Sequence, residues 1–181
     1  MKIALLSDLH LSVHPMDVPR TDADIVVLAG DLHRPPTAIA WARQFRQPVV
    51  YVAGNHEFYG SDLVSTNAQL RALARGSGVR VLECQVWRYQ GLRFLGCTLW
   101  SDHRLHDDDD DLRTEGLRQA TTLVRDYLRI GVAPDFEARF TPAISQLLFE
   151  RSVAWLEHCF ELEPDTPTVV VTHFAPARGS I

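Results

Sequence analysis

The sequence predicts an α/β fold built around a parallel β-sheet. Several short segments are continuously apolar, rich in β-branched residues and bounded by polar residues or glycine, and a helix-like segment separates two of them. Continuous apolar runs of this length are typical of parallel strands that are buried on both faces. The predicted strands are Ile3–Leu6, Ile25–Ala29, Val49–Ala53 and Val169–Thr172.

Two helices are predicted next to these strands. The segment Thr37–Arg46 carries apolar residues on one side and follows Pro35 and Pro36, which suit the first turn of a helix. It lies between the second and third strands and therefore predicts a β-α-β unit. A second helix, Asp62–Arg75, is followed closely by glycine, a common residue after a helix end.

The middle of the chain has a different pattern. Three short strands are predicted there, and Gln90–Gly91 offers a tight turn, so this part is expected to be antiparallel and to form a mixed second sheet. Two long amphipathic stretches further on predict two helices. The strands are Arg80–Leu82, Val86–Tyr89 and Leu92–Leu95, and the helices are Leu112–Ile130 and Thr141–Glu161.

Length and composition restrict the class of protein. A chain of 181 residues with 46% hydrophobic residues fits one globular domain, 1–181. The net charge of −5 argues against a dedicated nucleic-acid-binding protein, although a nucleic acid could still be a substrate. The first apolar run is too short for a signal peptide or a membrane span. The three cysteines are odd in number and form no C-x-x-C pair, which suggests a reducing cytoplasm. Oligomerisation is left open.

Polar side chains that can bind metals follow four of the predicted strands. The first strand leads to Asp8-Leu9-His10, the second to Gly30-Asp31, and the third to Gly54-Asn55-His56-Glu57. The last leads to His173. Ligands of open α/β sheets bind at the carboxyl ends of the strands, so these side chains are expected to converge. Each motif alone is weak, but their combination in this order indicates a metal site.

These motifs resemble those of the calcineurin-like metallophosphoesterases, a family of dinuclear-metal phosphoesterases. The family pattern is D-x-H, G-D, G-N-H-[DE], a lone histidine and then G-H-x-H, and this sequence contains the first four elements in that order. The resemblance covers most of the chain at the level of motif order. It implies the family fold, a four-layer αββα sandwich with two mixed sheets between helices.

The resemblance also implies a role for each matching residue. Asp8 and His10 resemble ligands of one metal, Asp31 resembles the carboxylate that bridges both metals, and Asn55 and His173 resemble ligands of the second metal. A bridging carboxylate holds two cations close enough to clamp phosphoryl oxygens and to acidify a shared water. Oxygen and imidazole donors suit Mn, Fe, Zn or Co, among which the sequence does not discriminate.

The implied activity is hydrolysis of a small phosphomonoester or phosphodiester by a metal-bridging hydroxide, without a covalent enzyme intermediate. His56 resembles the family's non-ligand histidine, which stabilises developing charge or protonates the leaving alkoxide. The residues after Gly30-Asp31 do not match those of the protein serine/threonine phosphatases, which argues against that branch. His33 is a weaker candidate for the same site.

The sequence also departs from the family pattern at its end. No G-H-x-H follows His173 before the last residue, Ile181, so each metal would lack one imidazole. We therefore expect either a truncated or abbreviated chain or a partner that supplies the missing element. A non-catalytic scaffold with the same fold is the alternative function, and a metallohydrolase of a substrate without phosphate is a third.

Two other segments have weaker interpretations. The acidic run Asp107–Asp111 is expected to be a solvated loop before a helix, with some benefit from the helix dipole. The segment Trp100–His103 lacks the surroundings of a serine nucleophile, and its position between core elements suggests a loop over the substrate cleft.

Overall fold

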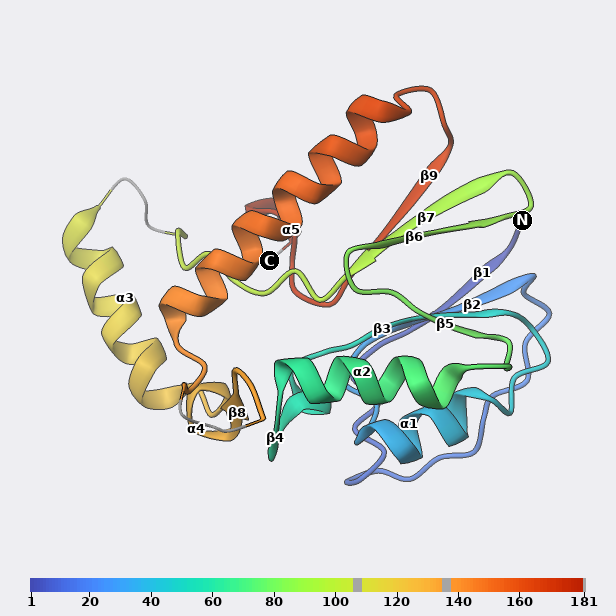
Figure 1. Cartoon of the computed structure of the whole chain (residues 1–181), viewed down its shortest axis with the longest axis horizontal. Helices are drawn as coiled ribbons and strands as arrows, with labels where there is room; N and C mark the ends of the chain where they lie inside the picture. Colours follow the sequence, from blue (N-terminus) through green and yellow to red (C-terminus); the bar gives the residue numbers. More distant parts are fainter. Residues whose placement is uncertain (106–108, 135–137, 181) are drawn as a thin grey trace.

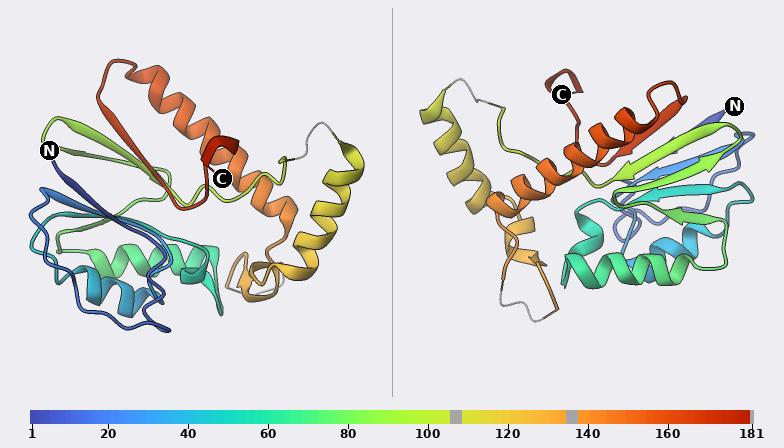
Figure 2. Two further views of the ribbon diagram at one scale, coloured as in Figure 1. Left: turned by 180° about the vertical axis from the view of Figure 1, so that it is seen from behind. Right: turned by 45° about the horizontal axis from the view of Figure 1, so that its top comes forward.

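The two larger of the three β-sheets in the described residues lie face to face, with helices on both outer sides (Figures 1 and 2), and the third is a small two-stranded sheet. This computed structural model describes residues 1–105, 109–134 and 138–180. The layers run from two helices through the first sheet and the second sheet to one long helix (Figure 1). This order confirms the expected mixed α/β, four-layer fold.

The first sheet is parallel and has the strand order β1-β2-β3-β5. Its two central strands are buried along their whole length, as their continuous apolar sequences predict. The prediction of full burial is wrong for β1, which lies at the sheet edge and leaves Ile3 and Leu5 exposed. It is also wrong for the strand Thr168–Thr172, where Val170 is exposed. The strands are β1 (Ile3–Leu6), β2 (Ile25–Ala29), β3 (Val49–Val52) and β5 (Val79–Val81).

The second sheet has the order β6-β7-β9 and is mixed, as predicted. Strands β6 and β7 are antiparallel, whereas β7 and β9 are parallel. Two predictions about strand partners are wrong: β5 joins the parallel sheet beside β3, and β9 joins this sheet instead of the first. Apolar sequence alone does not reveal the partner of a strand. The bounds are β6 (Gln85–Tyr89), β7 (Leu92–Cys97) and β9 (Thr168–Thr172).

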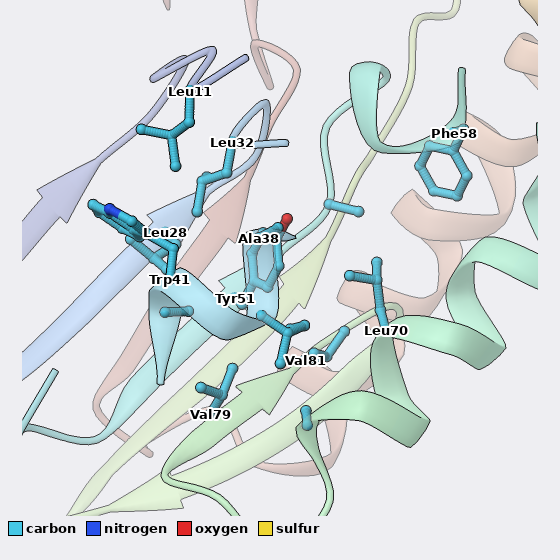
Figure 3. Close-up of a cluster of buried hydrophobic side chains, with 14 of the residues drawn as sticks. Leu11, Leu28, Leu32, Ala38, Trp41, Tyr51, Phe58, Leu70, Val79 and Val81 are labelled. Atoms are coloured by element: carbon cyan, nitrogen blue, oxygen red, sulfur yellow. The ribbon is translucent and has the colours of Figure 1, made fainter. Parts of the chain in front are cut away.

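Helices α1 (Pro35–Ala42) and α2 (Leu63–Ala74) cover the outer face of the first sheet (Figure 1). Proline occupies the first turn of α1, and the Asp62 side chain caps α2 by accepting a hydrogen bond from the Ser65 backbone N–H at 2.7 Å. Apolar side chains from both helices and the sheet form one buried cluster (Figure 3). This cluster includes Leu28, Ala38, Trp41, Tyr51, Leu70 and Val79.

A second buried cluster joins the two sheets. Val27 and Val50 of the first sheet pack with Phe94 and Val171 of the second. Helix α5 (Pro142–Leu162) covers the other side of the second sheet, where the buried Arg93 side chain donates to the Cys159 carbonyl at 2.7 Å. The inter-sheet contacts bring the carboxyl end of β9 beside that of β2, which positions the site described below.

The predicted helix Leu112–Ile130 is interrupted. Helix α3 (Asp110–Leu123) ends before Val124, and a short helix α4 (Asp126–Arg129) follows, so the prediction of one helix is wrong. The break turns Asp126 and Tyr127 into the protein, where both are buried. These elements lie beyond the carboxyl ends of the strands (Figure 1). The remaining elements are η1 (His56–Phe58), β4 (Ser61–Asp62), β8 (Ile130–Gly131) and η2 (Arg178–Ser180).

The acidic run lies partly outside the described residues, which do not include Asp107 and Asp108. Asp109 caps α3 by accepting a hydrogen bond from the Leu112 N–H at 2.9 Å, and Asp110 and Asp111 lie in the first helical turn. Carboxylates at this end of a helix interact favourably with its dipole, as predicted. Among the described residues, no helix combines the length and apolarity needed to cross a membrane.

Candidate dinuclear metal centre

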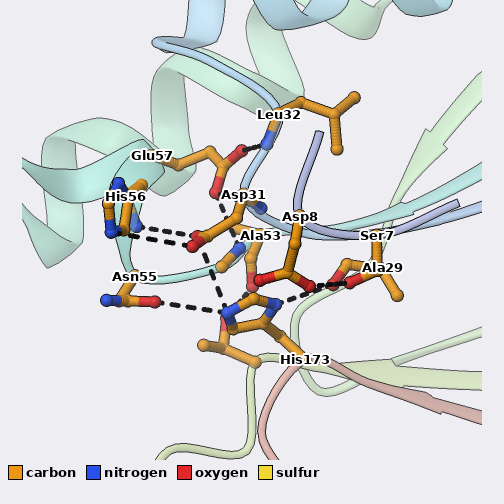
Figure 4. A network of polar contacts seen from close by, with 12 residues as sticks. Ser7, Asp8, Ala29, Asp31, Leu32, Ala53, Asn55, His56, Glu57 and His173 are labelled. Carbon is orange, nitrogen blue, oxygen red and sulfur yellow. Dashed lines mark hydrogen bonds and ion pairs between the residues drawn. The ribbon is translucent and has the colours of Figure 1, made fainter. Parts of the chain in front are cut away.

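The polar side chains at the strand ends converge on one point (Figure 4). Two groups of metal-capable side chains have ligand atoms within 4.8 Å of one another, and Asp31 belongs to both groups. One group contains His10, Asp31 and His56, and the other contains Asp8, Asp31 and His173. The carboxylate predicted to bridge two metals therefore occupies the shared position. His33 belongs to neither group.

The Asp31 carboxylate is buried between the surrounding histidines. Its Oδ2 atom lies 3.8 Å from the Nε2 atoms of both His10 and His56, and its Oδ1 atom lies 3.6 Å from Nε2 of His173. Oδ1 also accepts a hydrogen bond from the His56 backbone N–H at 2.9 Å. Its two oxygens thus face different groups of side chains, which is the geometry that a bridging ligand requires.

The backbone holds three of these residues in an uncommon conformation. Asp8, His10 and Asp31 have positive φ angles of 54°, 43° and 57°. Aspartate and histidine tolerate this left-handed region better than most residues, although it remains uncommon for them. Strain of this kind persists where the surrounding structure fixes the residue, and it is found frequently at functional sites.

Glu57 fixes the loops after β2 and β3 relative to each other. Its fully buried carboxylate accepts hydrogen bonds from the backbone N–H groups of Asp31, Leu32 and Gly54 at 3.0, 2.7 and 2.8 Å, and from the Tyr51 hydroxyl at 2.8 Å. Loss of hydration raises the pKa of Glu57, whereas these hydrogen bonds oppose the rise. Glu57 thus determines where Asp31 lies.

Asn55 is oriented by a residue that no sequence motif indicates. The carboxylate of Asp126 accepts hydrogen bonds from Asn55 Nδ2 at 2.8 Å and from the Tyr59 hydroxyl at 2.6 Å. Because a carboxylate only accepts, the Asn55 amide must direct its oxygen the other way, toward His173. Asp126 lies in a stretch predicted as continuous helix, and only the helix break brings it here.

The arrangement around His173 fits a bound cation. Its Nδ1 atom lies 2.7 Å from the Ala29 carbonyl, which can only accept, so Nδ1 carries a proton, and in the tautomer with a single proton Nε2 has a lone pair. Nε2 lies 3.2 Å from Asn55 Oδ1, which is also an acceptor, and 3.6 Å from the Asp31 carboxylate. In that tautomer three acceptors converge, which is an arrangement that a metal ion would satisfy, and the Nδ1 hydrogen bond is typical of a ligating histidine.

His56 lies beside the centre on η1. Its ring stacks on Tyr59 with 4.4 Å between ring centres and contacts His10 edge-on at 4.7 Å. Burial lowers the pKa of His56, an effect that the neighbouring Asp31 carboxylate opposes. At neutral pH the His56 ring is therefore mainly neutral and carries one N–H.

A cavity lies beside Phe174, the residue that follows His173. It has a volume of about 570 Å³ and is lined by Trp100–Leu105, part of α3 and Phe174–Ala177. Trp100 stacks on Phe174, the residue after His173, with 5.6 Å between ring centres. The segment Trp100–His103 therefore lies next to the candidate centre, and its role as a loop over the substrate stays a prediction.

The family model of the calcineurin-like phosphoesterase superfamily domain matches residues 1–124, more than half of the chain. The chain belongs to this superfamily. The match contains Asp8, His10, Asp31, Asn55 and His56. A comparison with curated proteins found no match. Membership supports the phosphoesterase class and divalent metals as its cofactors, and the convergence of ligand-capable side chains agrees with both.

Close packing in this calcineurin-like centre predicts a large effect of Gly54→Ala. A Cβ atom at position 54 would lie 2.1 Å from Asp31 Oδ1 and 2.6 Å from the Asp31 backbone nitrogen, so the backbone must move. We expect the free energy of unfolding to fall by about 2 kcal/mol and the bound metal to decrease. Denaturant titration and metal analysis measure both effects.

The matched control is Gly116→Ala in α3, where the added Cβ would have no neighbour within 4 Å. This change should stabilise the protein by up to about 1 kcal/mol, because alanine favours helix more than glycine does. Equal behaviour of the two variants would contradict the tight packing of Gly54 against Asp31.

Proposed function

We propose that this chain is a metal-dependent phosphoesterase that hydrolyses a small phosphomonoester or phosphodiester. The observation that carries the proposal is the position of Asp31, whose two carboxylate oxygens face separate groups of ligand-capable side chains. Membership of the calcineurin-like phosphoesterase superfamily supports the same reaction class. A scaffold would not require converging acceptors at this point.

We assign Asp8, His10 and Asp31 to one divalent cation, and Asp31, Asn55 and His173 to a second. Asp8 Oδ1 lies 4.0 Å from His10 Nε2, although the two groups of ligand atoms pair Asp8 with His173 and His10 with His56, so Asp8 would have to turn toward His10 when the metal binds. When bound, such cations polarise phosphoryl oxygens and lower the pKa of water. The mixture of carboxylate, amide and imidazole donors supports Mn, Fe, Zn or Co, with manganese as the first metal to test.

His56 is proposed as the catalytic residue that acts on the leaving oxygen. The stacking contact with Tyr59 supports one orientation of its ring, with Nε2 directed toward Asp31. The N–H of the neutral ring can donate a hydrogen bond to a developing alkoxide, and a protonated ring can transfer the proton itself. Asp126 and Glu57 are positioning residues for Asn55 and Asp31.

We also propose a class of substrate, a compartment and a domain organisation for this chain. The cavity beside Trp100 and Phe174 has room for the organic part of a small phosphoester. Cys84, Cys97 and Cys159 are unpaired, which supports a reducing compartment such as the cytoplasm. The buried clusters on both sides of the first sheet support one domain over residues 1–181.

Replacing His56 with alanine tests the proposed reaction. We expect turnover of bis(p-nitrophenyl) phosphate and p-nitrophenyl phosphate, measured with added Mn²⁺, to fall by about 10²- to 10⁴-fold. Metal content, measured by elemental analysis, should stay near that of the unchanged chain, because His56 is assigned no metal. The control is His158→Ala, on the exposed side of α5.

Two results would contradict this role. Full turnover in His56→Ala would mean that the ring takes no part in the reaction. Loss of metal would make His56 a ligand, which its distance of 3.8 Å from Asp31 allows in principle. Absence of both metal and turnover in the unchanged chain would instead support the scaffold.

A further inference from the structure

A second cavity lies on the His56 side of the candidate centre. It has a volume of about 450 Å³, and all of its charged lining residues are arginines, namely Arg34, Arg129 and Arg139. The remaining lining residues are Tyr59, Gly60, Leu128 and Ile130. Three cations around one cavity are unusual for a chain whose net charge is −5.

Among the residues that the structure describes, no acidic side chain lies within ion-pair distance of the three guanidinium groups. Arg34 donates a hydrogen bond to the His56 carbonyl, and Arg139 donates one to the Leu128 carbonyl at 3.3 Å. The guanidinium carbons of Arg34 and Arg129 lie 5.6 and 5.3 Å from the centre of the Tyr59 ring. Packing thus gathers the positive charges, and no ion pair neutralises them among residues 1–105, 109–134 and 138–180.

Nearby carboxylates are already engaged in other contacts. Glu57 attracts Arg34 from a distance but is fully buried and accepts four hydrogen bonds. Asp126 accepts from Asn55 and Tyr59. The three arginines are exposed, so water screens part of the repulsion that Arg129 exerts on Arg34, and an anion in the cavity would be attracted by all three charges.

The cavity is connected to the candidate centre through two aromatic rings. Tyr59 lines the cavity and stacks on His56 at 4.4 Å, and His56 Nε2 lies 3.8 Å from Asp31. The arginine cavity and the candidate centre are therefore neighbours, with the His56 and Tyr59 rings between them.

We infer that this arginine cavity binds a second phosphate of the substrate, so that the preferred substrate is a phosphoester that carries another phosphate beyond the one hydrolysed. Guanidinium groups match phosphate oxygens in charge and in hydrogen-bond geometry. That the bound phosphate belongs to a substrate rests on the proposed function, whereas anion binding at the cavity does not depend on it.

The first experiment measures anion binding without metal. Pyrophosphate is titrated calorimetrically into the chain in excess EDTA, where Asp8 and Asp31 would repel an anion from the candidate centre. We expect saturable binding that weakens at least about tenfold in the double variant Arg129→Gln/Arg139→Gln, since each charged hydrogen bond contributes enough for such a factor. Arg34 is left unchanged because it contacts His56.

The matched control is Arg46→Gln. Arg46 is exposed and precedes β3, so it lies at the amino ends of the parallel strands, opposite the candidate centre. Its replacement removes one positive charge and should leave pyrophosphate affinity within about twofold. Thermal unfolding of all variants verifies that they fold. No saturable binding, or equal binding by the double variant, would overturn the inference.

The second experiment separates a substrate phosphate from a free anion. Hydrolysis of the dinucleotide TpT is compared with that of pTpT and TpTp in the metal-loaded chain. A kcat/KM at least about tenfold higher for one phosphorylated form, lost in the double variant, supports the inference. Pyrophosphate binding without this preference would make the cavity a site for a free anion. Binding without any hydrolysis, including that of bis(p-nitrophenyl) phosphate, would count against the proposed function and leave only the anion site.

Discussion

Asp31→Asn is expected to remove bound metal and to reduce phosphoester hydrolysis by about 10³-fold or more, equivalent to at least about 4 kcal/mol of transition-state stabilisation. The asparagine oxygen can still accept the hydrogen bond that Asp31 Oδ1 accepts from the His56 N–H at 2.9 Å. The other side of the residue would present an amide instead of a carboxylate oxygen to His10 and His56. One side of the proposed bridge is therefore lost without a change in side-chain shape.

Elemental analysis and turnover of bis(p-nitrophenyl) phosphate, measured on the same sample, test this expectation. Asp165→Asn is the matched control, because Asp165 is exposed and lies after α5, away from the strand ends. Circular dichroism shows whether Asp31→Asn folds. A folded Asp31→Asn variant with unchanged metal content and turnover would refute the assignment of Asp31 as a bridging ligand.

The position of the site could be predicted from the sequence because it depends on strand ends. Buried parallel strands have a recognisable composition, and their carboxyl ends meet at one edge of the sheet. His173 lies beside Asp8 and Asp31, as expected from its place after a strand, even though β9 belongs to the second sheet. Val171 packs between the sheets, and that contact places the end of β9 beside Ala29 of β2.

The parts that could not be predicted depend on contacts between distant segments. The helical periodicity after Leu112 continues through Val124, so nothing in the sequence indicates that the helix ends there and that Asp126 turns toward Asn55. The arginine cavity is similar, since Arg34, Arg129 and Arg139 come from three separate segments. Apolar periodicity describes local structure, whereas these groups meet only through tertiary packing.

Glu57 illustrates the same limit within a recognised motif, and its replacement should have the largest effect on stability. The motif Gly54-Asn55-His56-Glu57 indicates an acidic residue at this position but not its burial. Glu57→Ala would leave three backbone N–H groups and the Tyr51 hydroxyl without their acceptor. We expect the free energy of unfolding to fall by about 3 to 5 kcal/mol, because unsatisfied buried donors are costly.

Glu57→Gln separates the effect of shape from that of charge. The amide of glutamine has the size of the carboxylate, but its NH₂ group would face donors, so this variant should also be destabilised, by about 2 kcal/mol or more. Glu161→Gln, on the exposed surface of α5, should change stability by less than about 0.5 kcal/mol. Urea titration of the three variants measures these differences.

The Glu57 variants also test how the metal centre is held. Because Glu57 binds the N–H groups of both Asp31 and Gly54, a folded Glu57→Gln protein should lose metal affinity by about 10- to 100-fold, as expected for a residue that orients ligands. Metal titration at a temperature well below unfolding measures this change. Retained affinity in a destabilised Glu57→Gln variant would show that the two loops keep Asp31 in place without the carboxylate.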